Sequence, residues 1–159
     1  MWFSFYVDHR RGSSAGLTQQ DQLQGAWVLE KYSFEGEQMQ GAVDPAQAGI
    51  FLFVDGHYSF SYVLGDQPRQ RLPADPSPVE IASAYRSFVA NTGTYVATDS
   101  TLQTFPVVTR NPNVQADNAD PVFYQYKVDE ETMVLVLPEA PGDVKVKVTY
   151  VLRKSQDGE

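Results

Sequence analysis

The chain has 159 residues and a formal net charge of −8, and hydrophobic and charged residues make up 42% and 20% of it. This length and balance predict one globular domain and exclude a disordered or fibrous chain. The acidic charge argues against nucleic acid and anionic membranes as partners, because both attract basic surfaces. The chain has no cysteine, which excludes disulfides, thiolate metal sites and cysteine catalysis.

The chain begins with a short apolar run, MWFSFYV, followed at once by DHRR. A secretory signal places its basic residues before a longer apolar run, so this order predicts a cytoplasmic protein without a signal peptide. No run approaches the roughly 18 apolar residues of a membrane span. We expect a flexible arm at residues 1–20, a barrel domain at 21–154 and a tail at 155–159. In the alternative, the arm docks on the domain, on a protein partner or on a second copy in a homodimer, through Trp2, Phe3, Phe5 and Tyr6.

Most of the remaining chain consists of short β-type runs between turn residues. Asp55-Gly56 separates two of them and predicts a tight hairpin. The last run alternates strictly, which is typical of an antiparallel sheet with one buried face. The eight predicted strands are Ala26–Phe34, Gly49–Val54, His57–Val63, Thr94–Ala97, Thr101–Thr109, Val122–Val128, Thr132–Leu137 and Val144–Leu152.

One segment, Ser77–Ala90, has the apolar spacing of a helix instead. Ser77 and Glu80 predict a capping box around Pro78, which suits the first helical position. Polar loops flank it at Gly65–Asp75 and, further on, at Arg110–Pro121. Eight antiparallel strands with one helix predict an up-and-down barrel, which leaves no sheet edge open. We expect the helix to pack across one opening or flank of this barrel. A two-sheet sandwich is the alternative fold.

Two motifs resemble known barrel proteins. Gly25-Ala26-Trp27 resembles the Gly-x-Trp of lipocalins. The resemblance implies that Trp27 plugs the base of the barrel and that an arginine from the end of the last strand, here Arg153, packs over its ring.

The segment from Ala84 to Tyr95, AYRSFVANTGTY, resembles the helix-to-strand pattern of the bacterial lipocalin-like domain family. Leu23–Trp27, Asp55-Gly56-His57 and Asn111-Pro112-Asn113 fall where that family has L-x-G-x-W, a D-G hairpin and N-P-N. The resemblance extends from Leu23 to Arg153. The strand before N-P-N carries no histidine, unlike many members, so no role built on that histidine transfers. The family implies an interior cavity for a small hydrophobic molecule; some related barrels are natural-product cyclases or isomerases.

The residues themselves indicate no metal site and no cofactor. His9 and His57 are the only histidines, and an exposed His57 is a simpler interpretation than a haem ligand. Neither a nucleophile elbow nor a phosphate-binding glycine loop occurs, so the sequence assigns no catalytic residue.

Aromatic residues, 13% of the chain, supply the candidate site. They recur at every second position of several strands and would form an apolar wall with phenol donors, or simply fill the core. The candidates for ligand contact are Phe53, Tyr58, Tyr62, Tyr85, Tyr95 and Tyr124. Glu30, Lys31 or Arg86 would add a charge if it faced inward. Three hypotheses follow: binding of a small hydrophobic or aromatic molecule, a cofactor-independent cyclase or isomerase, and an interaction module that uses the aromatic arm.

Overall fold

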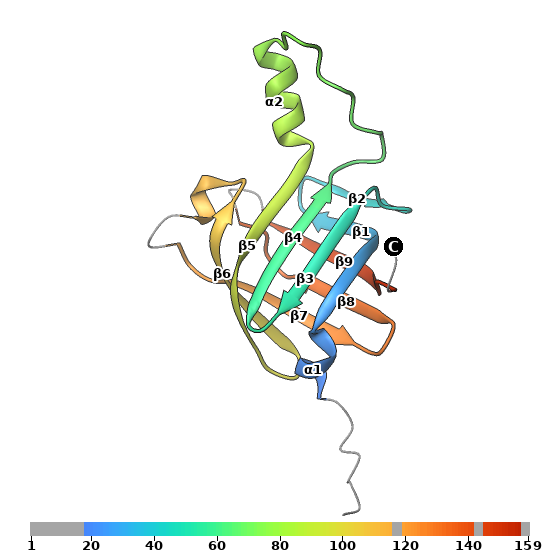
Figure 1. The fold of residues 1–159 in the computed structure, drawn as a ribbon, viewed down its shortest axis with the longest axis vertical. Helices are drawn as coiled ribbons and strands as arrows, with labels where there is room; N and C mark the ends of the chain where they lie inside the picture. Colours follow the sequence, from blue (N-terminus) through green and yellow to red (C-terminus); the bar gives the residue numbers. More distant parts are fainter. Residues whose placement is uncertain (1–17, 116–118, 142–144, 157–159) are drawn as a thin grey trace, which may run out of the picture.

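The strands of the protein close into a barrel. The computed structural model describes residues 18–115, 119–141 and 145–156. The strands pair antiparallel in the order β2-β1-β3-β4-β5-β6-β7-β8-β9, and pairing of β1 with β9 closes an eight-stranded barrel from which β2 is left out (Figure 1). The predicted all-β barrel is therefore confirmed, and the sandwich is wrong. The strands are β1 (Gly25–Gly36), β2 (Gln40–Val43), β3 (Gly49–Val54), β4 (His57–Val63), β5 (Phe88–Ala97), β6 (Thr101–Thr109), β7 (Val122–Val128), β8 (Thr132–Leu137) and β9 (Val146–Lys154).

Alternation of side chains places the core inside this barrel. In β3, Phe51 and Phe53 are buried while Ile50 and Leu52 face outward. β7 alternates without a break from Val122 to Val128. The Asp55-Gly56 turn between β3 and β4 has positive φ at both residues, 47° and 76°, as a two-residue hairpin requires.

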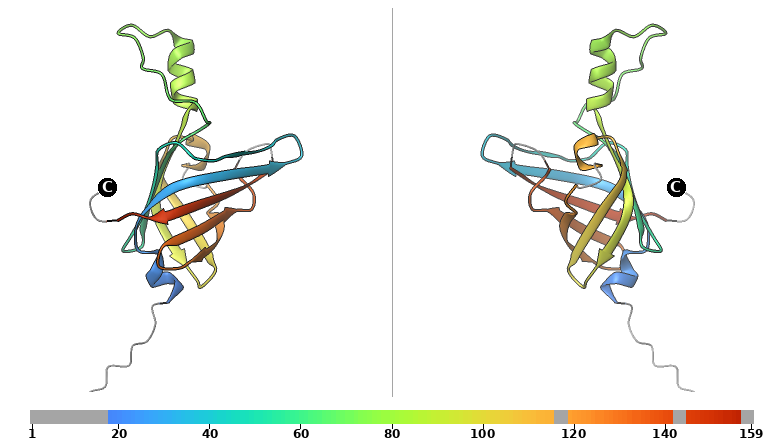
Figure 2. Two further views of the ribbon diagram at one scale, coloured as in Figure 1. Left: turned by 90° about the vertical axis from the view of Figure 1, so that its right-hand side faces the viewer. Right: turned by 90° about the vertical axis from the view of Figure 1, so that its left-hand side faces the viewer.

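The first strand departs from strict alternation. Its register with β9 shifts between Leu29 and Lys31, so Glu30 is the extra residue of a β-bulge. Glu30 and Lys31 are both exposed, and neither supplies a charge to the interior. Beyond the bulge, β1 continues into a hairpin with β2, an element that the sequence pattern did not predict, and this hairpin extends away from the barrel (Figure 2).

The predicted helix is shorter than expected and lies elsewhere. α2 (Pro78–Arg86) begins with the predicted capping box of Ser77 and Glu80. It ends at Arg86 because Phe88–Ala90 pair with β4 and belong to β5. We expected the helix to pack across one opening or flank; instead it projects away from the barrel, and none of its residues is buried (Figures 1 and 2).

A short helix, α1 (Gln19–Leu23), precedes the first strand and covers the opposite end of the barrel (Figure 1). Thr18 caps it, and Gln19 Nε2 donates to Val128 O at 2.9 Å. Thr18 to Gln20 are therefore part of the folded domain and not of an arm. Residues 1–17, with the aromatic set of the interaction hypothesis, lie outside the described residues. Within the described part of the chain, no helix is long and apolar enough to cross a membrane.

The β5–β6 pair explains one residue of the family pattern, Gly93. The register shifts between Thr92 and Gly93, and Pro106 pairs with Gly93 at this irregularity, as expected for a proline that removes a ladder donor. A Cβ added to Gly93 would lie 2.1 Å from the backbone oxygen of Phe105. Only glycine therefore allows the two strands to approach this closely.

We expect Gly93→Ala to lower the free energy of unfolding by about 1–3 kcal/mol, because the new methyl group forces two paired backbones apart. Urea unfolding followed by circular dichroism measures the change. Gly41→Ala is a control for the loss of a strand glycine, since its φ is not positive and the nearest atoms to the Cβ it would add belong to the Phe34 side chain, not to a backbone. The close approach would be refuted if Gly93→Ala cost no more than Gly41→Ala.

Candidate ligand-binding site at the open end of the barrel

The end of the barrel at α1 is closed by packed side chains. Trp27 is fully buried there, and its Nε1 donates to Leu23 O at 2.8 Å. Phe53, Met133 and Leu152, whose exposure is also zero, belong to the same hydrophobic core. The closed base leaves the opposite end, near α2, as the place where a ligand can enter.

Lys154 takes the position that the family resemblance assigns to Arg153. Its Nζ lies 4.4 Å from the centre of the Trp27 ring, because Lys154 is the direct β-ladder partner of Trp27. Arg153, one residue earlier, has its Nε 3.5 Å from Glu30 Oε1. Successive side chains of a strand point to opposite faces of the sheet. Lys154 therefore lies on the same face as Trp27, and Arg153 lies on the other face. Burial lowers the pKa of Lys154.

The open end contains a hollow of about 250 Å³ inside the ring of strands. Most of its wall is apolar, as in sites for small organic molecules. Its polar side chains come from β4, β5, β7, β9, the last residue of β6 and the segment after it. They are Tyr62, Asn91, Thr109, Arg110, Asn111, Tyr124 and Tyr150.

Two tyrosines form a hydrogen-bonded pair in this hollow. The Tyr62 and Tyr150 hydroxyl oxygens lie 2.9 Å apart, and either can donate. Both rings pack on Phe51, at centroid distances of 5.7 Å and 5.5 Å. A pair of hydroxyls uses one proton internally and keeps the other for an external acceptor. The pair therefore presents one O–H donor at a fixed position.

Burial keeps these phenols protonated. It raises the pKa of Tyr62 to about 12, although the hydrogen bond from Tyr150 and the charge of Arg110 act in the opposite direction. Burial also raises the pKa of Tyr150 well above its usual value. Near neutral pH both groups are hydrogen-bond donors and not phenolate bases.

A third phenol, Tyr124, has no hydrogen-bond partner among the described residues. Burial raises its pKa, and the neighbouring Tyr62 and Tyr58 raise it further. Every fully enclosed side-chain oxygen or nitrogen of the described part has a partner. The Tyr124 oxygen must therefore reach the open space of the hollow, where a polar ligand atom can accept its proton.

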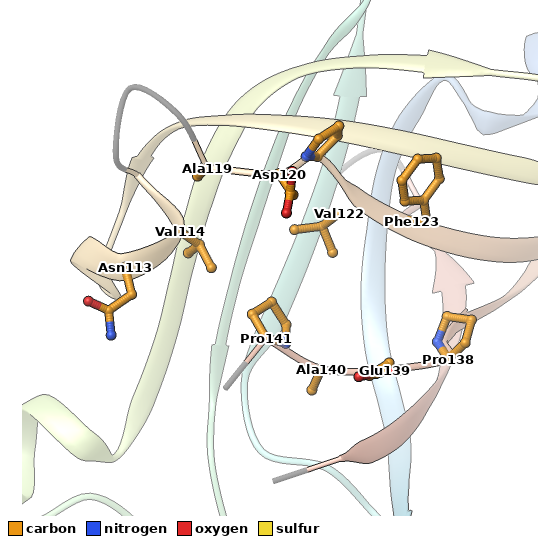
Figure 3. Close-up of a pocket in the computed structure, with 11 residues that line it drawn as sticks. Asn113, Val114, Ala119, Asp120, Val122, Phe123, Pro138, Glu139, Ala140 and Pro141 are labelled. Atoms are coloured by element: carbon orange, nitrogen blue, oxygen red, sulfur yellow. The ribbon is translucent and has the colours of Figure 1, made fainter. Parts of the chain in front are cut away.

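Two further hollows adjoin the central one. One, of about 440 Å³, lies between the β1–β2 hairpin and the residues after β4, and it shares Tyr62 and Val148 with the central hollow. The other, of about 540 Å³, lies between the loop after β6 and the β8–β9 connection. Val114 and Val122 line it opposite Ala140 and Pro141, and these four residues also line the central hollow (Figure 3).

The structure separates the six aromatic residues that the sequence singled out. Tyr62 and Tyr124 line the central hollow. Tyr58 reaches it indirectly, through a 2.8 Å hydrogen bond to Asn91. Phe53 and Tyr95 pack on each other toward the closed base, with ring centroids 5.3 Å apart, and Tyr85 is exposed on α2.

Sequence reasoning missed five of the seven polar side chains of the hollow, among them Tyr150 and Arg110. Tyr150 stands on the buried face of the last alternating run, so the pattern contained its orientation but not its partner. Arg110 follows β6 directly, in a segment that reads as a loop, and no local signal relates it to Tyr62. The exposed Arg86 of α2, a candidate charge, does not line the hollow.

Comparisons with known proteins bear on the fold. No protein-family model and no curated protein matches the chain. Among solved structures, it is similar to a lipocalin-like protein from Bacteroides uniformis ATCC 8492, with 14% identity and a TM-score of 0.44. It is also similar to an uncharacterized protein from Bacteroides eggerthii DSM 20697, with 13% identity and a TM-score of 0.45. Each alignment covers 84% of this chain and 99% of the other. The closed eight-stranded antiparallel barrel is the fold class that the sequence predicts.

Proposed function

We propose that the protein binds a small, largely apolar molecule in the hollow at the open end of the barrel. The observation that carries this proposal is the convergence of three phenols, Tyr62, Tyr124 and Tyr150, in a cavity whose wall is mostly apolar. A buried hydroxyl without a protein partner is costly unless a bound molecule or water satisfies it. The site thus combines apolar contact area with a few positioned donors, as small-molecule sites do.

The adjoining hollows give such a ligand enough room. The central hollow of about 250 Å³ is small for an organic ligand, but the apolar hollow of about 440 Å³ lies beside it and shares Tyr62 and Val148 with it. Together they suit a flat or extended molecule with its polar atoms among the phenols and its apolar part below the β1–β2 hairpin.

A neutral apolar dye, N-phenyl-1-naphthylamine, tests this binding. We expect one saturable site on the wild-type protein, detected by an increase in dye fluorescence. Val148→Trp adds bulk at a residue that lines both hollows and should weaken binding at least tenfold, which corresponds to about 1.4 kcal/mol. Val96→Trp is the matched control, because Val96 faces outward with 61% of its surface exposed. Absence of dye binding, or equal binding by both variants, would refute the proposal.

A second candidate is catalysis of cyclisation or isomerisation in the same hollow. It is favoured by the fixed O–H of the Tyr62–Tyr150 pair, which could donate to an oxygen on which negative charge develops. A flexible substrate would be held in a reactive shape by the apolar wall. In this case Tyr150→Phe would lower turnover more than substrate binding, whereas in a binding protein only affinity would change.

A further inference from the structure

We propose that the ligand carries an anionic oxygen group, such as a carboxylate, which binds between the guanidinium of Arg110 and the phenols of the central hollow. This inference rests on the proposed binding function and specifies the chemical class of the ligand. It comes from the charges around the hollow.

Arg110 is the one charged residue among the described residues that line the central hollow. It is half-buried, and no described carboxylate forms an ion pair with it. This is unexpected in a chain with 20 acidic and 12 basic residues. A half-buried cation without a counterion is costly, so a bound anion would stabilise this arrangement.

The position of Arg110 is held by its neighbours. Its backbone N–H donates to Ala90 O at 2.8 Å, which ties the residue to β5. Its Nη1 donates to Tyr85 O at 2.9 Å, and the guanidinium lies 5.1 Å from the centre of the Tyr85 ring. The Tyr85 hydroxyl donates in turn to Arg110 O. These contacts orient the guanidinium and use one of its five N–H donors, which leaves four for a ligand.

The phenols supply donors to the same ligand group. Tyr124 has no described partner, the Tyr62–Tyr150 pair retains one proton, and the charge of Arg110 acts on Tyr62. No acidic residue lines the central hollow among those described, whereas Asp66 lines one adjoining hollow and Asp120 and Glu139 line the other. An anionic group is therefore favoured in the centre, and a cationic ligand would find no counter-charge there.

Matched pairs of acids and amides test this inference. Decanoate and decanamide, and 2-naphthoate and 2-naphthamide, are compared as competitors that displace N-phenyl-1-naphthylamine at neutral pH. We expect at least one acid to displace the dye at concentrations at least tenfold lower than its amide. The aliphatic and aromatic pairs show which skeleton the apolar wall prefers.

Variants assign the preference to Arg110. The ratio compared is the amide concentration that displaces the dye divided by the acid concentration that does so. In Arg110→Gln this ratio should fall to about one. Arg110→Lys keeps the charge and should retain part of the preference for the acid. Arg86→Gln is the matched control, because Arg86 is exposed on α2 and lies outside the hollow.

The outcomes separate the two proposals. If the dye does not bind to the wild-type protein, the binding function itself is wrong. If the dye binds but acids and amides displace it equally, or if Arg110→Gln keeps the wild-type ratio, only the anionic ligand is wrong. A ratio lost in Arg110→Gln and retained in Arg86→Gln supports the inference.

Discussion

Replacement of Trp27 by alanine is expected to lower the free energy of unfolding by about 3–5 kcal/mol. The side chain is fully buried at the closed base of the barrel. Its loss leaves a cavity that rigid strands cannot fill, removes the hydrogen bond to Leu23 O and leaves Lys154 without the aromatic face beneath its ammonium group. The closed base is thus the part of the barrel where a single substitution should cost most.

Chemical unfolding followed by circular dichroism measures this loss. Phe105→Ala is the matched control, because Phe105 is also a large aromatic residue on a strand but faces outward with 40% exposure. We expect that substitution to cost less than about 1 kcal/mol. Similar losses in the two variants would show that Trp27 does not plug the barrel.

Raising the pH from about 10 to 12 is expected to unfold the protein. Burial is the main cause that raises the pKa of six tyrosines. The pKa reaches about 12 for Tyr58, Tyr62 and Tyr126. The other three are Tyr95, Tyr124 and Tyr150. In the unfolded chain these groups lose their protons near pH 10, whereas in the folded barrel they keep them. Stability is therefore fully present below pH 10 and falls as the pH rises toward the folded pKa values.

The size of this effect follows from the number of protons involved. Each tyrosine that stays protonated only in the folded state lowers the free energy of unfolding by about 1.4 kcal/mol per pH unit. The three most deeply buried phenols, those of Tyr62, Tyr124 and Tyr150, together approach the whole stability of an ordinary domain within about two pH units. Tyrosinate absorbance and circular dichroism should change together in one cooperative transition.

The variant Tyr150→Phe gives a control for that transition. It removes one buried phenol at the open end and should make the loss of stability with pH less steep. A gradual rise of tyrosinate absorbance near pH 10 without loss of circular dichroism would contradict the prediction, because it would mean that most phenols ionise in the folded barrel.

Local patterns in the sequence predict much of the barrel. The hairpin at Asp55-Gly56, the alternation of Val122–Val128 and the capping box of Ser77 with Glu80 all depend on residues that are near neighbours in the chain. Backbone sterics and hydrogen bonds act over this range, so these features could be read without the fold.

Other features depend on contacts between distant segments. The helix spacing continues to Ala90, yet Phe88–Ala90 form a strand because β4 provides a pairing edge. The bulge at Glu30 arises where β1 meets β9 to close the barrel, and the same pairing places Lys154, and not Arg153, over Trp27. Propensity is a small preference that such tertiary pairing overrides.

The candidate site also depends on contacts between segments that are distant in the sequence. The sequence alone indicated a barrel with inward-facing aromatic residues, and it placed Tyr62 and Tyr124 among the candidates. It could not bring Tyr62 to Tyr150, which are 88 positions apart, or Arg110 to the same hollow. It also could not show that Tyr85 stays outside while Tyr95 packs near the base. Period two gives the side of a strand on which a residue lies, but strand register and barrel closure decide which residues meet at one end.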